Sequence, residues 1–263
     1  MDKFLTSFDN TQLYVNENIV DGSQIAIVIL HGLAEHSGRY CDFINALNKA
    51  NISTFACDLR GHGKSGTKLG DIESFNYLLE DVEVVFNYII KNFNFKKVGV
   101  FGHSIGGLIA SAYISKTGKF NFCVLSSPVC YLPKKLKVIK IVPYKLLKNV
   151  YVKKRVSESQ EMLNVNRQDP LSLKKFSVRT VGEIFNFGVK FLNKNLNIQC
   201  PAMLVCGKQD VMLSETEQFK TFFNKLPNAQ NKFIVYADAK HRIVQNQNAD
   251  SHIADIISWI KNL

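Results

Sequence analysis

Residues 100–110 read VFGHSIGGLIA, and they place a serine between two glycines where an apolar run gives way to small residues. The run before the serine, residues 96–101 (KKVGVF), has the short apolar pattern of a buried parallel strand. The segment after it, residues 104–113 (SIGGLIASAY), is small, apolar and free of proline, as suits a helix packed closely on a sheet. A strand that turns this sharply into a helix exposes the serine hydroxyl and leaves no room for large neighbours. Gly-x-Ser-x-Gly also occurs by chance, but this context predicts that Ser104 is a nucleophile.

Strand-like and helix-like patterns alternate along most of the chain. Strand runs are expected at residues 25–30, 52–59, 96–101, 122–125, 202–206 and 232–236, and helical spacing at 39–50, 75–93, 104–113, 215–226 and 253–263. Strands that alternate with helices predict an α/β fold, in which a mostly parallel central sheet has helices on both faces.

The alternation stops near Pro128 and resumes at Pro201. We therefore expect the core to be formed by two segments, with an inserted lid, or cap, between them. The first part of the core is predicted at residues 1–128, the lid at 129–199 and the second part of the core at 200–263.

A serine nucleophile needs a histidine to take its proton and a carboxylate to hold that histidine. Asp210 comes where the strand run at residues 202–206 ends, and His241 follows the run at 232–236. Both therefore fall at the carboxyl ends of expected strands, which meet at one edge of a parallel sheet. We predict that Asp210 and His241 complete a catalytic triad with Ser104.

Two other residues compete for these roles. Asp238 is the alternative acid, but three residues from His241 is a strained geometry for a partner of that histidine. His252 is the alternative histidine, and its place in the closing helical pattern predicts a surface position.

Acyl transfer also requires backbone N–H groups directed at the charge that develops on the substrate oxygen. One donor is predicted to be the N–H of Ile105, which follows the nucleophile. The other should come from the loop at residues 31–40 (HGLAEHSGRY), which follows an early strand run. We assign it to the N–H of Leu33, with His31 and Gly32 shaping the turn.

Three stretches together resemble the signatures of monoacylglycerol lipases and related lysophospholipases. They are residues 31–40 (HGLAEHSGRY), 58–66 (DLRGHGKSG) and 102–107 (GHSIGG). The first is far more discriminating than the third, because hydrolases of other substrate classes share the serine motif. The resemblance runs through the whole core and implies an α/β-hydrolase fold with a lid and the activity of a serine hydrolase on lipid esters.

The resemblance also implies that Glu35 and Arg39 bind the polar head of the substrate; the alternative is a charge pair at the start of a helix. Some of these lipases have a second histidine three residues after the catalytic one, where this chain has Val244. The loop at residues 58–66 carries residues that look catalytic, but its two interior glycines suggest a tight crossing, and we expect it to be structural.

Composition limits the remaining possibilities. The amino terminus has acids and amides where a secretory signal needs an apolar segment, and no run approaches the roughly 20 apolar residues of a membrane-spanning helix, so we expect a cytoplasmic protein. The six cysteines are scattered without a C-x-x-C pair, which favours buried thiols over disulfides or a metal site. No metal or organic cofactor is expected.

The formal net charge of +11 is unevenly distributed. Residues 134–155 hold nine basic residues and no acid, interleaved with apolar ones. This combination predicts a lid element that contacts an anionic membrane surface, making the protein peripheral. A merely solvated lid is the alternative, and nucleic acid is not expected as a partner because no nucleic-acid module accompanies the charge.

These observations predict hydrolysis of the carboxylic ester of a lipid, a monoacylglycerol or a lysophospholipid, through an acyl-enzyme. Within enzymes the alternatives are a short-chain carboxylesterase or thioesterase and, further off, an aminopeptidase. A non-catalytic binding protein on the same scaffold is the alternative from a different class.

Overall fold

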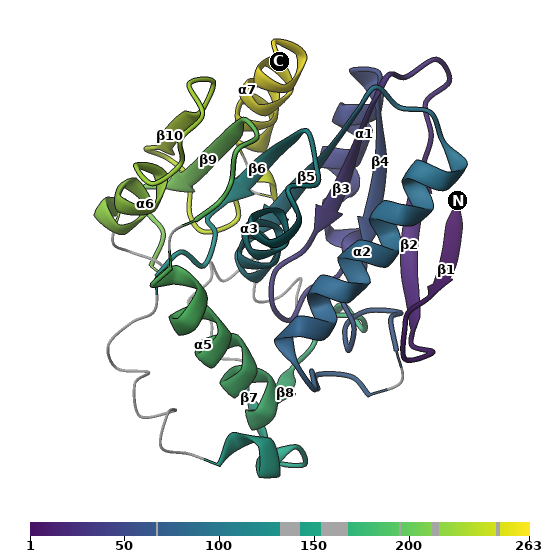
Figure 1. The fold of residues 1–263 in the computed structure, drawn as a ribbon, viewed down its shortest axis with the longest axis vertical. Helices are drawn as coiled ribbons and strands as arrows, with labels where there is room; N and C mark the ends of the chain where they lie inside the picture. The colour runs from purple at the N-terminus through teal and green to yellow at the C-terminus, as the bar shows by residue number, and fades with distance from the viewer. Residues whose placement is uncertain (67, 132–142, 154–167, 195, 212–215, 246–247) are drawn as a thin grey trace.

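The computed structural model describes residues 1–263 except 67, 132–142, 154–167, 195, 212–215 and 246–247. Its centre is an eight-stranded sheet with the strand order β1-β2-β4-β3-β5-β6-β9-β10 (Figure 1). The strands are β1 (Asp2–Thr6), β2 (Gln12–Asn18), β3 (Ile25–Leu30), β4 (Ile52–Cys57), β5 (Lys97–His103), β6 (Phe122–Ser126), β9 (Ala202–Gly207) and β10 (Lys232–Tyr236).

Only the strands at one edge run antiparallel. β1 pairs with β2 and β2 with β4 in antiparallel register, whereas every pair from β4 to β10 is parallel. The central strands are apolar and buried along their length, because helices cover both faces of a parallel sheet. The predicted α/β-hydrolase fold, with a mostly parallel sheet between helices, is confirmed.

The helices form two layers. They are α1 (Cys41–Lys49), α2 (Phe75–Asn92), α3 (Ile105–Thr117), α6 (Thr216–Phe223) and α7 (Ala249–Lys261), with short 3-10 helices η1 (Ser37–Tyr40) and η4 (Ile243–Gln245). The apolar side chains of α2, α3 and α6 share one buried cluster with the sheet, and those of α1 and α7 share the other.

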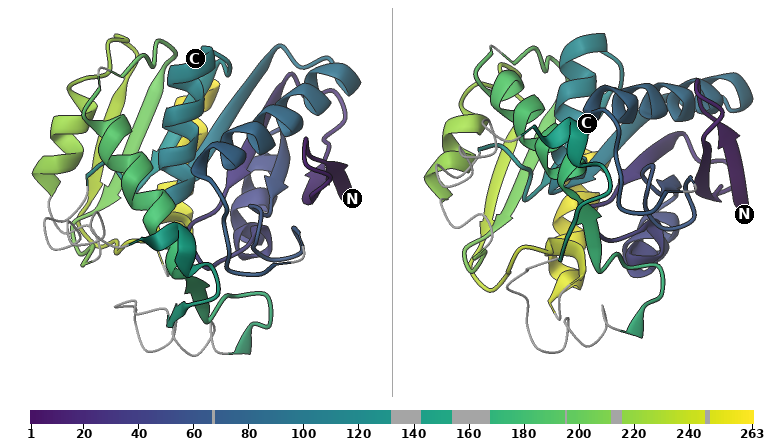
Figure 2. Two further views of the ribbon diagram at one scale, coloured as in Figure 1. Left: turned by 60° about the horizontal axis from the view of Figure 1, so that its bottom comes forward. Right: turned by 90° about the horizontal axis from the view of Figure 1, so that it is seen from below.

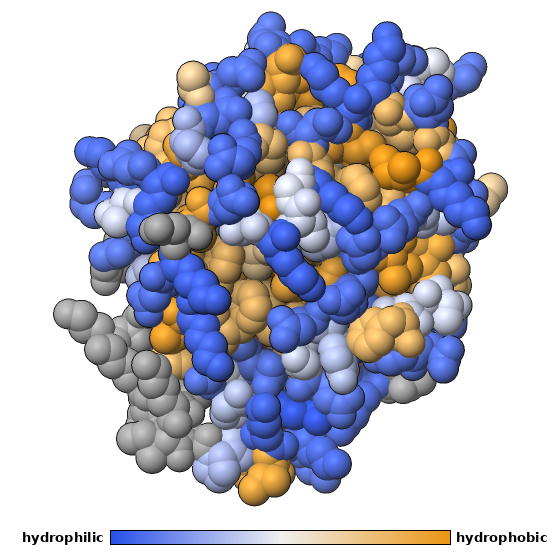
Figure 3. All heavy atoms as spheres, viewed as in Figure 1, coloured by the Kyte–Doolittle hydropathy of each residue, from blue (hydrophilic) through white to orange (hydrophobic). Residues whose placement is uncertain are grey.

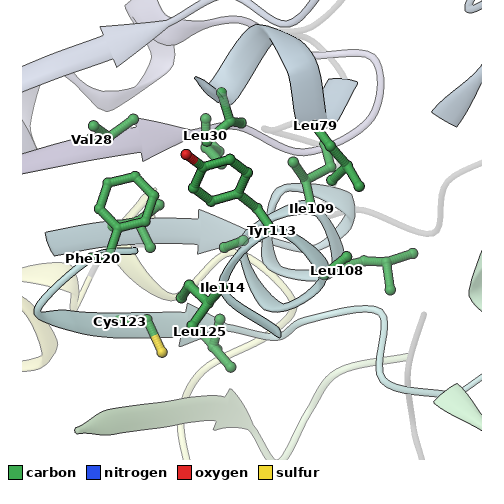
Figure 4. Packing of buried hydrophobic residues seen from close by; sticks show 14 of the residues in the cluster. Val28, Leu30, Leu79, Leu108, Ile109, Tyr113, Ile114, Phe120, Cys123 and Leu125 are labelled. Atoms are coloured by element: carbon green, nitrogen blue, oxygen red, sulfur yellow. The ribbon is translucent and has the colours of Figure 1, made fainter. Parts of the chain in front are cut away.

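Helix α3 is buried along most of its length. Figure 4 shows Leu108, Ile109 and Tyr113 of this helix packed among residues of β3, α2 and β6. The small residues that begin α3 let its backbone approach the sheet, as the sequence predicted. This close approach fixes the position of the residue at the start of the helix, Ser104.

The described part of the predicted lid lies outside the large sheet. It contains η3 (Tyr144–Leu147), the antiparallel pair β7 (Tyr151–Lys153) and β8 (Lys175–Ser177), and α5 (Val178–Leu192). β6 and β9 are neighbours in the sheet, and none of the described residues between them adds a strand to it. The views in Figure 2 show β7 and β8 at one end of the molecule and α5 beside α3. The boundaries 1–128, 129–199 and 200–263 stay a prediction.

Helix α5 is anchored on the loop that precedes α2. The Phe187 ring stacks on Phe75 with 3.9 Å between centroids, and the hydroxyl oxygen of Thr180 accepts from the backbone N–H of Ile72 at 2.7 Å. Arg179 pairs with the buried carboxylate of Asp71. These contacts join the predicted lid to the core by packing, a hydrogen bond and an ion pair.

All six cysteines are free thiols. Five are buried or half-buried, but Cys41 is exposed at the start of α1, contrary to a uniformly buried set. Among the described residues there is no group of three or more metal-ligating side chains. Within the same residues, no helix is both long and apolar enough to cross a bilayer.

Candidate active site

Ser104 occupies a strained turn between β5 and α3. Its backbone has φ 53° and ψ −114°, a conformation that costs a non-glycine residue about 1–3 kcal/mol. The turn permits only glycine on either side of the serine. A Cβ atom added to Gly106 would lie 2.2 Å from the carbonyl oxygen of Leu30, and a Cβ atom added to Gly102 would lie 2.4 Å from the carbonyl oxygen of Gly106. The geometry is that of the sharp strand-to-helix turn that the sequence predicted.

Asp210 and His241 come together from two separate loops. His241 Nδ1 lies 2.7 Å from Asp210 Oδ2, and the carboxylate is buried. The backbones of the two loops approach each other closely. A Cβ atom added to Gly207 would lie 2.2 Å from the carbonyl oxygen of Ala239, so only glycine fits at this position. Since the carboxylate accepts the Nδ1 proton, Nε2 of His241 carries the lone pair.

The ring of His241 lies close to the residue that precedes Ser104. It lies 4.8 Å from the ring of that residue, His103. Within the described part of the chain, the buried Nε2 has no hydrogen-bond partner. An imidazole held at Nδ1 and unoccupied at Nε2 can act as a general base toward a hydroxyl.

The two competing residues pair with each other. His252 Nε2 lies 3.3 Å from Asp238 Oδ1, and Asn248 donates to the other oxygen of that carboxylate at 2.6 Å. The predicted surface position of His252 is wrong: only 2% of the residue is exposed, and its ring lies 3.8 Å from that of Tyr236. His252 lies on the face of α7 that packs on the sheet, where an imidazole with two polar partners is tolerated.

The loop at residues 31–40 lies directly against Ser104. A Cβ on Gly32 would be 3.4 Å from Ser104 Cβ and 2.9 Å from His103 Cδ2. The next residue carries the predicted oxyanion donor, the N–H of Leu33. The second predicted donor, the N–H of Ile105, is in the first turn of α3, where backbone N–H groups lack intrahelical acceptors and carry partial positive charge.

Glu35 is a buried anion beneath this loop, only 1% exposed. Its Oε1 accepts from the backbone N–H of Gly32 at 2.8 Å and from the hydroxyl of Tyr40 at 3.0 Å. Burial alone would raise the pKa of this carboxyl, but the charge of Arg242, whose Nη2 lies 3.8 Å from Oε2, and nearby histidines hold it well below its usual range. Gln245 also donates to Oε2 at 3.3 Å. Glu35 therefore links this loop to the loop of His241.

Arg39 faces the lid. Its Nη1 lies 3.4 Å from Oδ2 of Asp169. The same oxygen lies 2.8 Å from Nε2 of His36. Burial would raise the pKa of the Asp169 carboxyl, but its hydrogen bonds lower it to about 2. The lid backbone joins the same contact, because the N–H of Leu173 donates to the carbonyl oxygen of Ala34 at 3.2 Å.

The loop at residues 58–66 has the supporting contacts expected of a structural segment. The Asp58 carboxylate accepts from the backbone N–H groups of Ser37 and Lys64, both at 2.7 Å. Arg60 forms a double hydrogen bond with the carboxylate of Asp81. Val244 is buried in η4.

Sequence reasoning missed two residues of this site. Asp169 lies in the lid, 130 positions from Arg39, and its sequence context gives no sign of the pairing. Arg242 directly follows the predicted base, so the sequence could have indicated that it lies near the site. The sequence could not indicate that its partner is the buried carboxylate of Glu35.

The strained serine, the paired aspartate and histidine, and the parallel sheet define a serine hydrolase of the α/β-hydrolase class. The chain belongs to the Hydrolase_4 family, described as serine aminopeptidase, S33, whose profile matches residues 22–248.

Individual relatives are distant but cover most of the chain. A monoacylglycerol lipase of Mycolicibacterium smegmatis is 24% identical over 245 residues, which are 89% of this chain and 87% of that protein. An uncharacterized abhydrolase domain-containing protein of Dictyostelium discoideum is 23% identical, and the match covers 89% of this chain but 26% of that protein. The crystal structure of a Paleococcus ferrophilus monoacylglycerol lipase superimposes with a TM-score of 0.81 at 23% identity, covering 95% of this chain and 98% of that one. The chain thus shares its fold with this lipase over nearly its whole length.

Proposed function

We propose that the protein hydrolyses carboxylic esters of lipids through a triad of Ser104, Asp210 and His241. The observation that carries the proposal is the 2.7 Å contact between His241 Nδ1 and Asp210 Oδ2 beside a serine held at φ 53°. A histidine fixed in this tautomer presents Nε2 to the hydroxyl, and the aspartate stabilises the imidazolium that forms.

The proposed reaction has two stages. Ser104 Oγ attacks the ester carbonyl while His241 takes its proton, and the N–H groups of Leu33 and Ile105 stabilise the oxyanion. His241 then returns the proton to the leaving alcohol, which leaves an acyl-enzyme. Water, activated by the same imidazole, releases the fatty acid. These steps require neither a metal nor an organic cofactor.

The proposed substrates are monoacylglycerols or lysophospholipids. Support comes from the signature at residues 31–40 and from relatives named as monoacylglycerol lipases. The family's description names an aminopeptidase, so amides are the informative competitors. A hydrolysis panel of monoacylglycerols, lysophospholipids, short esters, thioesters and aminoacyl amides tests this choice. Fastest turnover of a monoacylglycerol or lysophospholipid is expected, and fastest turnover of amides would overturn it.

The nucleophile is tested by Ser104→Ala. This variant should lose turnover and labelling by a fluorophosphonate probe while remaining folded, because the hydroxyl is the reacting atom. Ser111→Ala is the matched control: this serine is also buried in the same region, and its hydroxyl donates to Gly107 O in α3. Labelling of Ser104→Ala would refute the assignment, and a wild-type protein that neither labels nor turns over any ester would favour a non-catalytic binding protein.

Recognition of the polar head by Glu35 and Arg39 stays a prediction. The two oxygens of Glu35 already accept protein hydrogen bonds, and Arg39 lies against Asp169. The side chain of Glu35 is only 1% exposed, and this arrangement favours a structural role in which Glu35 supports the loop. Arg39, whose side chain is 10% exposed, is the better candidate for a substrate contact.

We also propose that the lid contacts anionic membrane surfaces. Half of residues 134–155 lie outside the described residues; within the described part, Leu146 is 81% and Val150 48% exposed, beside the exposed Lys145 and Lys148. On the face shown in Figure 3, hydrophobic and hydrophilic residues stand side by side at the lid end of the molecule. Exposed apolar side chains beside lysines suit the boundary between headgroups and acyl chains.

The membrane contact predicts a substrate-dependent loss. Lys145→Gln with Lys148→Gln should weaken binding to phosphatidylserine vesicles at low salt by up to about thirtyfold, since each lysine near the surface contributes about 1 kcal/mol. Turnover of a soluble short ester should not change. Lys91→Gln with Lys96→Gln, at exposed positions outside the lid, is the control. Equal losses on vesicle-borne and soluble substrates would point to a damaged lid instead. Residence in the cytoplasm stays a prediction.

A further inference from the structure

His31 has both ring nitrogens engaged by backbone groups. It follows β3 directly and is completely buried. Its Nε2 lies 2.9 Å from the backbone nitrogen of Leu59, and its Nδ1 lies 2.7 Å from the carbonyl oxygen of Gly32. Both distances are those of good hydrogen bonds.

These two contacts determine the tautomer. The backbone N–H of Leu59 can only donate, so Nε2 of His31 must carry the lone pair. The proton therefore resides on Nδ1 and is donated to the carbonyl oxygen of Gly32. Burial lowers the pKa of His31 below its ordinary value, which keeps the ring neutral at neutral pH. The loop at residues 58–66 thus sets the proton position of a residue beside the nucleophile.

The carbonyl oxygen of Gly32 and the N–H of Leu33 belong to one peptide group. A peptide group is planar, so holding its oxygen also directs its N–H. A donor on the carbonyl also polarises the N–H and strengthens it as a donor in turn. The other side of Gly32 is held by its own N–H, which donates to Glu35 Oε1 at 2.8 Å.

We propose that His31 is a positioning residue that orients and polarises the Gly32–Leu33 peptide as an oxyanion donor. The inference rests on the proposed function, in which the Leu33 N–H stabilises the tetrahedral intermediate. A purely packing role is the alternative, because the His31 ring also lies 5.2 Å from that of His62 in a buried region.

Two substitutions, each of which keeps a polar atom near one ring nitrogen of His31, separate these roles. The side-chain amide of Asn places its nitrogen near Nδ1 of histidine, so His31→Asn keeps the donor to Gly32 and loses the acceptor for Leu59. Gln reaches the position of Nε2, so His31→Gln keeps the acceptor for Leu59 and loses the donor to Gly32. Asn removes more buried volume than Gln, so a purely packing role predicts the larger loss for His31→Asn, the opposite of the order expected here.

The readout is kcat and KM on a soluble short ester, together with melting temperature. His31→Asn should keep kcat within about tenfold of wild type, whereas His31→Gln should lose about 10²–10³ in kcat with little change in KM, as expected when an oxyanion donor is lost. Rates of fluorophosphonate labelling should follow the same order, because the adduct is tetrahedral. Equal losses in kcat, or losses that follow melting temperature alone, would overturn the proposal.

The wild-type protein provides a test that does not depend on folding of a variant. ¹⁵N NMR of the histidine ring nitrogens should show His31 as the neutral Nδ1–H tautomer throughout pH 6–8. An Nε2–H tautomer or a protonated ring would overturn the proposal. Failure of the proposed function is distinguishable, because it would appear as activity or labelling that survives Ser104→Ala.

Discussion

Replacing Asp169 by asparagine should detach the lid from the loop at residues 31–40. The carboxylate accepts from His36 Nε2 at 2.8 Å and from the hydroxyl of Ser172 at 2.9 Å, and it lies 3.4 Å from Arg39. Its side chain is 15% exposed, so solvent screens these contacts only in part. Asp169→Asn removes the charge while conserving size.

The size of the effect follows from the pKa. Hydrogen bonds lower the pKa of Asp169 from 3.8 to about 2, and a shift of that size corresponds to about 2 kcal/mol of stability. Because the folded-state pKa is depressed, this stability is complete above pH 4 or so, about half remains near pH 3, and it disappears as the pH falls through about 2. The free energy of unfolding should therefore differ by about 2 kcal/mol between wild type and variant at pH 7.

Urea unfolding at a series of pH values measures this difference. Asp21→Asn, in an exposed turn remote from the lid, is the control and should change stability by less than about 0.5 kcal/mol. Hydrogen exchange at the Leu173 amide, which donates to Ala34, should accelerate in Asp169→Asn. A difference that is absent at pH 7, or that stays the same from pH 7 to about 3, would refute the reasoning.

Four other substitutions test three separate parts of the structure. Asp210→Asn should lower kcat by about 10⁴ and Asp238→Asn by less than about tenfold, measured on a soluble ester; the reverse order would mean that the acid is misassigned. Gly106→Ala should lower kcat by about 10², because its Cβ would meet the carbonyl at the end of β3 at 2.2 Å and displace α3 by about 1 Å; wild-type kcat would contradict this contact. Arg179→Met should lower the free energy of unfolding by about 2 kcal/mol, because it leaves the buried Asp71 carboxylate with only the half-exposed Lys68, 3.0 Å away, as a charged partner; a loss below about 0.5 kcal/mol would contradict this reasoning.

The parts of the site that sequence could indicate are those with local signals. Ser104 is marked by the small residues that its turn requires, and Asp210 and His241 by the ends of apolar strand runs. His252 was misplaced because helical periodicity locates a face only approximately, and a polar residue next to Ile253 was assigned to solvent although Asp238 and a backbone carbonyl satisfy its ring.

The remaining contacts depend on tertiary structure. The pairing of Asp169 with His36 and Arg39 joins segments more than a hundred residues apart, and no local pattern records it. Similarly, the resemblance that assigned Glu35 to the substrate head says nothing about how deeply the carboxylate lies. Its exposure became known only with Arg242 and Tyr40 placed around it.

The backbone at Ser104 has a consequence for how this chain tolerates mutation. The positive φ of this residue is disfavoured for serine and readily adopted by glycine. Ser104→Gly should therefore raise the melting temperature even as it abolishes turnover. In a library selected only for thermal resistance, inactive glycine variants at this position should be enriched, whereas selection that also requires turnover should restore the serine.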